Sequence, residues 1–157
     1  MTSTDLPLAE EIAEQVHPAH PEDPKVFAER LRLFGQGCLI LELTGQPVGY
    51  AIAHPWVLDR PPKLNTLLQH LPGEPDTLFI HDLALLSGAR GRGHAAEAVR
   101  LMVRKAVLSR LPTLSLVAVG TSPAFWRCQG FVPLPDEAIQ NSLGSYGLGA
   151  RYMVRRL

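Results

Sequence analysis

Apolar residues recur at helical spacing in two segments near the N-terminus. A stripe of leucine, isoleucine and valine, four residues apart, predicts a helix over 8–16. Three prolines then interrupt regular structure over 17–24. Asp23 suits the N-cap of a following helix and Pro24 its first position, so we expect a second helix that ends at Gly35.

The rest of the chain alternates short β-favouring runs with helical patterns. An amphipathic helix with a wide apolar face is expected over 91–110. Because this helix connects two expected strands, 78–86 and 113–119, those strands should pair in parallel through a crossover. The pattern therefore predicts a mixed α/β fold. The other expected elements are strands at 38–43, 48–53, 131–134 and 150–157, a short helix near 64–71 and another at 122–129.

Length and composition narrow the class of protein. A chain of 157 residues fits one domain, so we expect a single domain over 1–157. Fifteen basic residues balance 15 acidic ones without long runs of one charge, which argues against nucleic-acid and membrane partners. No secretory signal is visible, and no apolar run reaches the ~20 residues of a membrane span. Cys38 and Cys128 form no C-x-x-C pair, so we expect two buried, reduced thiols in a cytoplasmic protein.

A strand that runs into a glycine-rich turn and then a helix is expected over 83–96. Free backbone N–H groups at such a helix start, together with the helix dipole, form an anion site. Gly91 and Gly93 would let the main chain approach a diphosphate, and Arg90 and Arg92 add positive charge. A tight turn that needs glycine only for a positive φ explains the same glycines.

A dinucleotide site is another interpretation of this turn, because residues 91–96 fit G-x-G-x-x-A. That fingerprint expects an acidic residue about 20 positions further on, where it would bind a ribose. No Asp or Glu lies between Glu97 and Asp136. The sequence therefore disfavours NAD as the ligand.

Two motifs in order carry a resemblance to a known family. Arg90-x-x-Gly93-x-Ala95 resembles the acetyl-CoA signature of the GNAT acetyltransferase superfamily, and residues 80–85 resemble its central strand. Further on, residues 122–131 are similar to its second signature, a short helix that ends in Gly-Phe. The resemblance implies the GNAT fold, with a mixed central sheet, a splayed parallel strand pair and about four flanking helices. Such domains usually open with a strand, which here is expected to be short or missing.

The resemblance implies an N-acetyltransferase in which an amine attacks the thioester of acetyl-CoA directly. The main chain of the central strand would hold the pantetheine and polarise the carbonyl at Leu83, Ala84 and Leu85. The pyrophosphate would bind the turn that consists of Arg90, Gly91, Arg92, Gly93, His94 and Ala95. The second signature would contribute Ser122, Phe125 and Trp126 to the cofactor site.

The attacking amine must first lose a proton, so the reaction needs a general base. Two candidate side chains lie on the central strand just before the point where it is expected to separate from its parallel neighbour. His81 and Asp82 are neighbours in a strand, so they should point to opposite faces. The resemblance is closest to the serotonin N-acetyltransferase branch, where a histidine at the position of His81 faces the acceptor. His81 can equally be a hydrogen-bonded core residue and Asp82 can fix a loop, so both stay candidates for the general base.

The departing thiolate is usually reprotonated in this family by a tyrosine, and Trp126 occupies that position here. An indole N–H donates a hydrogen bond but has no useful acidity near neutral pH. Tyr146, within 142–149, is a candidate substitute acid, or it only anchors that loop.

The acceptor pocket of this family forms between the N-terminal helices and the loop before the last strand. That location would place near it Glu22, Asp23, His54, Trp56 and Tyr146. No metal site is expected from His17 and His20, because prolines break the helix that their spacing would need.

The predicted partners are acetyl-CoA and an amine of a small molecule or protein. The sequence does not distinguish a monomer from a homodimer. A non-catalytic acyl-CoA-binding or sensor protein of the same fold is the alternative, to which the absence of the usual tyrosine adds weight.

Overall fold

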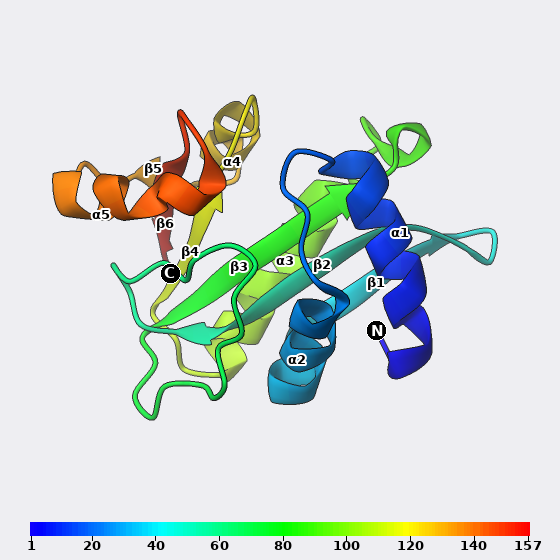
Figure 1. Cartoon of the computed structure of the whole chain (residues 1–157), viewed down its shortest axis with the longest axis horizontal. Helices are drawn as coiled ribbons and strands as arrows, with labels where there is room; N and C mark the ends of the chain where they lie inside the picture. The colour runs from blue at the N-terminus through cyan, green and yellow to red at the C-terminus, as the bar shows by residue number, and fades with distance from the viewer.

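A mixed six-stranded sheet runs through the centre of the molecule in the computed structural model, which describes residues 1–157 (Figure 1). The strands are β1 (Cys38–Leu43), β2 (Gln46–Trp56), β3 (Thr77–Leu85), β4 (Thr113–Ala118), β5 (Val132–Pro133) and β6 (Arg151–Arg156). Their order in the sheet is β1-β2-β3-β4-β6-β5. Only β3 and β4 are parallel neighbours. The predicted mixed α/β fold with one parallel pair is therefore confirmed.

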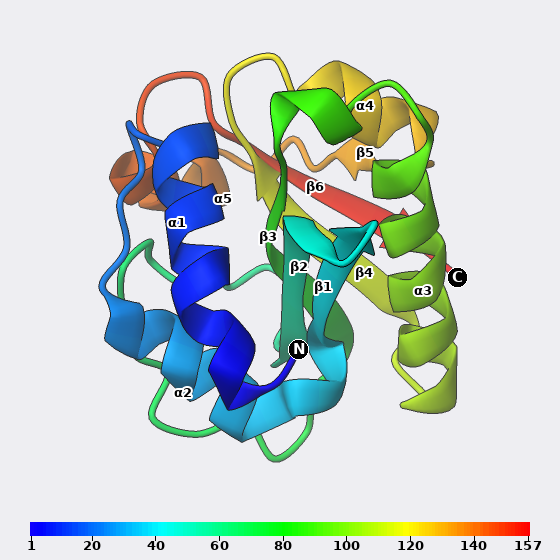
Figure 2. The ribbon, with the colours of Figure 1, turned by 90° about the vertical axis from the view of Figure 1, so that its right-hand side faces the viewer.

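Helices cover both faces of the sheet (Figure 2). The five helices are α1 (Leu6–Val16), α2 (Pro24–Phe34), α3 (His94–Leu108), α4 (Pro123–Cys128) and α5 (Glu137–Ser142). The largest apolar cluster lies between α3 and the sheet, a second under α1 and α2, and a third between α5 and β6. None of these helices combines the length and the apolar character needed to cross a bilayer.

The helix starts follow from local sequence. Asp23 caps α2, because its Oδ1 accepts a 2.8 Å hydrogen bond from the N–H of Lys25, and Pro24 occupies the first helical position as predicted. The long helix α3 begins later than expected, since Gly91 and Gly93 have φ values of 75° and 82° that a right-handed helix excludes.

The prediction of a short helix near 64–71 is wrong. This segment is irregular and belongs to the long connection between β2 and β3. Asn65 and Gln69 have positive φ values of 54° and 66°, which are incompatible with an α-helix. Polar contacts order the segment instead, and in one of them the buried Arg30 of α2 donates to the carbonyl of Thr66 at 2.8 Å.

Three further features differ from the sequence prediction or were not part of it. The helix α5 was not expected, and Asp136 caps it by accepting a 3.0 Å hydrogen bond from the N–H of Ile139. Cys38 is buried, but Cys128 at the end of α4 is exposed, so the expectation of two buried thiols is wrong for Cys128. Residues Ser3–Asp5 form a 3₁₀ turn before α1.

A β-bulge in β3 changes the direction of the side chains around His81. Ile52 of β2 pairs with Asp82, whereas the next residue of β2 pairs with Ile80, so His81 is the extra residue. His81 and Asp82 therefore both face the segment between α1 and α2, which each of them contacts. The prediction that they point to opposite faces is wrong, because regular alternation does not continue through a bulge.

Candidate active site

A cavity of about 470 Å³ opens where β3 and β4 separate. The two strands pair only over 77–80 and 113–116. The cavity walls come from the unpaired parts of both strands, the turn after β3, α4 and the segment after α1. The predicted cofactor residues that line it are Leu83, Leu85, Arg90, Ala95, Ser122, Phe125 and Trp126. Residues from both motifs of the sequence are thus brought to one cavity.

Two predicted cofactor residues turn their side chains elsewhere. Ala84 is buried in the apolar cluster under α1 and α2, as the alternation after the bulge requires. His94 lines a separate cavity of about 100 Å³ on the other side of the strand, together with Leu39 and Leu101.

The turn before α3 presents backbone N–H groups to open space. The first intrahelical hydrogen bond of α3 runs from the N–H of Glu97 to the carbonyl of Gly93 at 3.0 Å. The N–H groups of residues 93–96 therefore have no partner within the helix. A Cβ atom added to Gly91 or Gly93 would meet no atom within 4 Å, so the space in front of the turn is open. Arg92 is exposed on the same turn.

Two side chains frame the cavity between this turn and α4. Arg90 donates from Nε to the carbonyl of Leu85 at 2.9 Å, which holds its guanidinium at the end of β3. Trp126 packs edge-on against Phe125 and Phe131, with ring centroids 5.0 and 5.3 Å apart. The lining of the cavity thus includes a guanidinium from Arg90 and the aromatic rings of Phe125 and Trp126.

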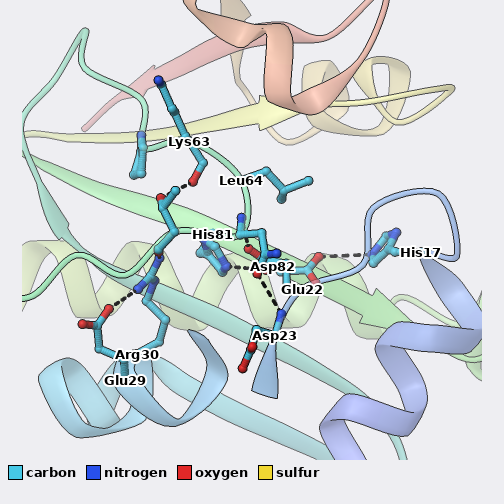
Figure 3. Close-up of polar contacts among 12 residues, drawn as sticks. His17, Glu22, Asp23, Glu29, Arg30, Lys63, Leu64, His81 and Asp82 are labelled. Carbon is cyan, nitrogen blue, oxygen red and sulfur yellow. Dashed lines mark hydrogen bonds and ion pairs between the residues drawn. The ribbon is translucent and has the colours of Figure 1, made fainter. Parts of the chain in front are cut away.

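His81 and Glu22 form a buried polar pair beside the cavity (Figure 3). His81 Nε2 lies 2.8 Å from Glu22 Oε2, and only 1% and 5% of the two side chains are exposed. The other oxygen of Glu22 accepts a 2.8 Å hydrogen bond from the N–H of Asn65. Burial disfavours the charged carboxylate, but the hydrogen bond and charge of His81 outweigh it and lower the pKa of Glu22. His81 Nδ1 is buried without a partner.

Asp82 forms a second polar group next to this pair. Its carboxylate accepts hydrogen bonds from the hydroxyl of Tyr50 and, at 2.7 Å, from the N–H of Leu83, and His17 Nε2 lies 3.1 Å from its Oδ1. Burial alone would raise the pKa of Asp82, but His17 and Tyr50 together lower it. Contact with Asp82 raises the pKa of His17 against the opposing effect of burial. The two groups are therefore favoured as carboxylate and imidazolium.

Tyr146 is buried, and its hydroxyl donates to the carbonyl of Pro62 at 2.8 Å. Burial also raises the pKa of this phenol. Tyr146 lines a small cavity of about 60 Å³ with His81 and Glu22, but it does not line the large cavity between β3 and β4. Its geometry matches a loop anchor better than a proton donor.

The other residues expected near the acceptor face elsewhere. His54 is fully buried between Trp56 and Phe79, with ring centroids 5.5 and 5.6 Å away, and burial lowers its pKa to about 3. Trp56 donates from Nε1 to the carbonyl of Arg60 at 2.6 Å. Asp23 is used as the cap of α2.

Three residues of this region have no role in the sequence prediction of the site. They are His17, which reaches Asp82 from the end of α1, Tyr50 on β2, and Asn65 in the connection between β2 and β3. Each contact joins residues more than 30 positions apart. No local pattern in the sequence indicates such contacts.

A second cavity, of about 280 Å³, adjoins Asp82 on the side of α1. Four of its 11 lining residues are the carboxylates Glu10, Glu14, Glu22 and Asp82, two are histidines, and no lysine or arginine lines it. Burial and the nearby Glu14 raise the pKa of Glu10. This cavity favours a cationic occupant over an anionic one.

A model of the acetyltransferase (GNAT) family matches residues 6–131. The chain therefore belongs to the GNAT acetyltransferase family, as its two motifs predicted. No curated protein sequence matches the chain.

Solved structures with the same fold are distant in sequence. One chain in the structure of the NatC complex bound to Gag peptide and CoA superposes on this chain with a TM-score of 0.73 at 17% identity. The match covers 99% of this chain and 92% of that one. Naa50 from Arabidopsis thaliana, in complex with the bisubstrate analogue CoA-Ac-MVNAL, has a TM-score of 0.73 at 14% identity, over 98% and 93%. The GphF GNAT-like decarboxylase in complex with isobutyryl-CoA has a TM-score of 0.75 at 14% identity, over 99% and 96%. At these identities the likeness shows the fold.

Proposed function

We propose that this protein is an N-acetyltransferase that transfers the acetyl group of acetyl-CoA to a primary amine of a small molecule or a protein. The observation that carries the proposal is the buried pair of His81 and Glu22 beside the cavity where β3 and β4 separate. This arrangement would join a proton acceptor to a cavity whose lining includes Arg90 and Ala95 from the turn before α3 and its first helical residues. A single domain over 1–157 would contain the whole site.

The chain's own residues fit a coenzyme A donor. The open turn at 91–93 and the free N–H groups that follow it suit a diphosphate, and Arg90 adds a positive charge. The N–H of Leu83 is bound to Asp82 and the carbonyl of Leu85 to Arg90, so the remaining backbone groups on the unpaired edge of β3 at Leu83 and Leu85 would hydrogen-bond the amide groups of a pantetheine arm. The CoA ligands of the NatC and Naa50 structures support this donor.

His81 would act as the base that receives the amine proton, directly or through a water molecule. Glu22 orients the imidazole through the 2.8 Å contact with Nε2, and Asn65 fixes Glu22 in turn. With Nε2 held by Glu22, the unpartnered Nδ1 is the atom available for a further hydrogen bond.

An amine acceptor agrees with the charge around the site. The carboxylate-lined cavity beside Asp82 would attract a protonated amine before it transfers its proton. The peptide-based analogue in the Naa50 structure supports a protein amino group among the candidates. Small primary amines fit the same chemistry.

A non-catalytic acyl-CoA-binding protein is the second candidate. Trp126 replaces the usual tyrosine acid, and the hydroxyl of Tyr146 is already bound to the carbonyl of Pro62. Both observations leave the thiolate without its usual proton donor, which favours this candidate.

Thermal unfolding and coenzyme A release together test the proposal. Acetyl-CoA should raise the melting temperature through binding to the folded state, whereas NAD and ATP at equal concentration should not. A thiol reagent should then detect CoA release with at least one member of a panel of small amines and N-terminal peptides. Equal stabilisation by NAD would overturn the assignment of the donor. Tight binding of acetyl-CoA without release for any amine would favour the non-catalytic candidate.

A further inference from the structure

His17 stands where the three cavities around the site meet. It lines the large cavity between β3 and β4, the carboxylate-lined cavity and the small cavity at Tyr146. It is the C-cap of α1, and its N–H donates to the carbonyl of Ala13 at 2.7 Å, which fixes its backbone. Its side chain is 27% exposed although its Nε2 atom is buried, so the ring reaches solvent and the cavity through its other atoms.

The surroundings of His17 stabilise a proton on its ring. Asp82 on β3 lies 3.1 Å from Nε2, and Tyr50 on β2 donates to the same carboxylate. The C-terminal end of α1 adds the negative end of a helix dipole. The other ionisable groups that share its cavities are the acidic Glu10, Glu14 and Glu22, the histidines His20 and His81, and Arg90, Tyr146 and Asp82. Contact with Asp82 raises the pKa of His17, and it outweighs the opposing effects of burial and of Arg90.

The site needs a proton donor that the usual position lacks. Trp126 cannot release a proton near neutral pH, and Tyr146 neither lines the large cavity nor has a free hydroxyl. Among the residues that line the same cavity as Leu83 and Trp126, His17 combines a favoured proton with access to solvent.

We propose that His17 is the general acid of the reaction and protonates the sulfur of coenzyme A as it departs. This inference rests on the proposed acetyl transfer. The amine nitrogen forms a bond to the acetyl carbon, the carbon–sulfur bond breaks, and its electron pair stays on sulfur, which takes a proton from His17. The proton lost by the amine goes to His81 or to water. His17 then recovers a proton from solvent, and Asp82 keeps its ring in place throughout.

Leaving-group dependence separates this role from a structural one. Replacement His17→Gln should lower kcat with acetyl-CoA by roughly 10²-fold, the usual weight of acid catalysis. With 4-nitrophenyl acetate, whose leaving group is stable as an anion at neutral pH, the same variant should keep its rate within about threefold, since no proton is needed. The matched control is His70→Gln, an exposed residue outside these cavities, which should match the wild type with both donors.

A rescue and a pH profile complete the test. Trp126→Tyr, made in the His17→Gln protein, should restore at least about tenfold in kcat, because a phenol would then line the cavity in place of the indole. In the wild type kcat should fall at high pH as His17 loses its proton, and the variant should lack that limb. Equal losses with both donors, or an unchanged rate with acetyl-CoA, would overturn the role of His17. An inactive wild type would overturn the proposed function itself.

Discussion

The imidazole of His81 and the carboxylate of Glu22 meet at 2.8 Å in a region that solvent barely reaches. Glu22 comes from the proline-rich segment between α1 and α2, and His81 is the bulged residue of β3. A bulge residue paired with a carboxylate from a distant loop is held by two independent elements. This geometry suits a base whose ring orientation matters.

His81→Ala should therefore lower kcat/KM by roughly 10²-fold, because the proton acceptor is lost. Steady-state rates with one amine and acetyl-CoA measure this loss. Asp82→Asn in a folded protein is the comparison. If His81→Ala keeps a normal rate while Asp82→Asn is inactive, His81 is not the base.

The glycine turn offers a matched pair of substitutions. Gly93 has a φ of 82°, whereas Gly88 has no left-handed φ, and at both positions an added Cβ would meet open space. Gly93→Val should weaken binding of coenzyme A by about 2–3 kcal/mol, because it strains the turn and places a branched side chain where the phosphates would approach. Gly88→Val should bind nearly as the wild type does. Calorimetry with folded variants decides, and equal affinities would remove the turn from the phosphate site.

The long connection between β2 and β3 is positioned by a buried charge pair on α2. Arg30 is fully buried, with Nη1 2.6 Å from Glu29 Oε2, and it donates to the carbonyl of Thr66. Arg30→Met should cost about 3–5 kcal/mol, because Glu29 is left buried without its cation. Arg32 is 64% exposed and 3.9 Å from the same carboxylate, so Arg32→Met should cost at most about 1 kcal/mol. Urea unfolding measures the free energy of unfolding of both variants. Similar losses would mean that the buried Glu29–Arg30 pair stabilises the protein no more than the exposed Arg32 does.

Most helices and strands could be predicted from the sequence, because each is marked by residues within the element itself. The Asp23–Pro24 start of α2 and the amphipathic face of α3 each lie within one helix, and the structure has both. The glycine turn and the second motif likewise came from short patterns. The helix predicted near 64–71 was wrong because a few apolar residues suggested it. The conformation of this segment is instead set by hydrogen bonds between its backbone and Glu29 and Arg30 of α2.

The candidate site could be predicted only in part, because its geometry depends on contacts between distant segments. The sequence predicted His81 and Asp82 as candidates, but the bulge depends on pairing with β2 and cannot be recognised in the sequence of β3 alone. Once the alternation shifts, Asp82 faces Tyr50 and His17, which come from other elements. The partners of each candidate side chain thus depend on how the sheet and the helices assemble.

A neutral buried histidine makes the stability of the protein depend on pH. His54 is fully buried, and its Nε2 has no partner. Burial first, and then the nearby charge of His81, lower its pKa from 6.5 to about 3. In the unfolded chain His54 takes up a proton near pH 6.5, whereas the folded protein does not until about pH 3. The ionisation of His54 therefore has no effect on the free energy of unfolding well above pH 6.5 and lowers it progressively as the pH falls from about 6.5 towards 3.

This ionisation should lower the free energy of unfolding by about 2 kcal/mol between pH 6.5 and 4.5, with a slope that approaches about 1.4 kcal/mol per pH unit. His54→Leu removes the titrating group and fills its place between Trp56 and Phe79 with an apolar side chain. Urea unfolding of both proteins at several values of pH isolates His54, because the carboxylates of Glu22 and Asp82 titrate in both. The variant should lose less stability on acidification than the wild type by about that amount. Parallel pH profiles would mean that His54 takes up its proton at the same pH in the folded and the unfolded protein, so that burial does not lower its pKa.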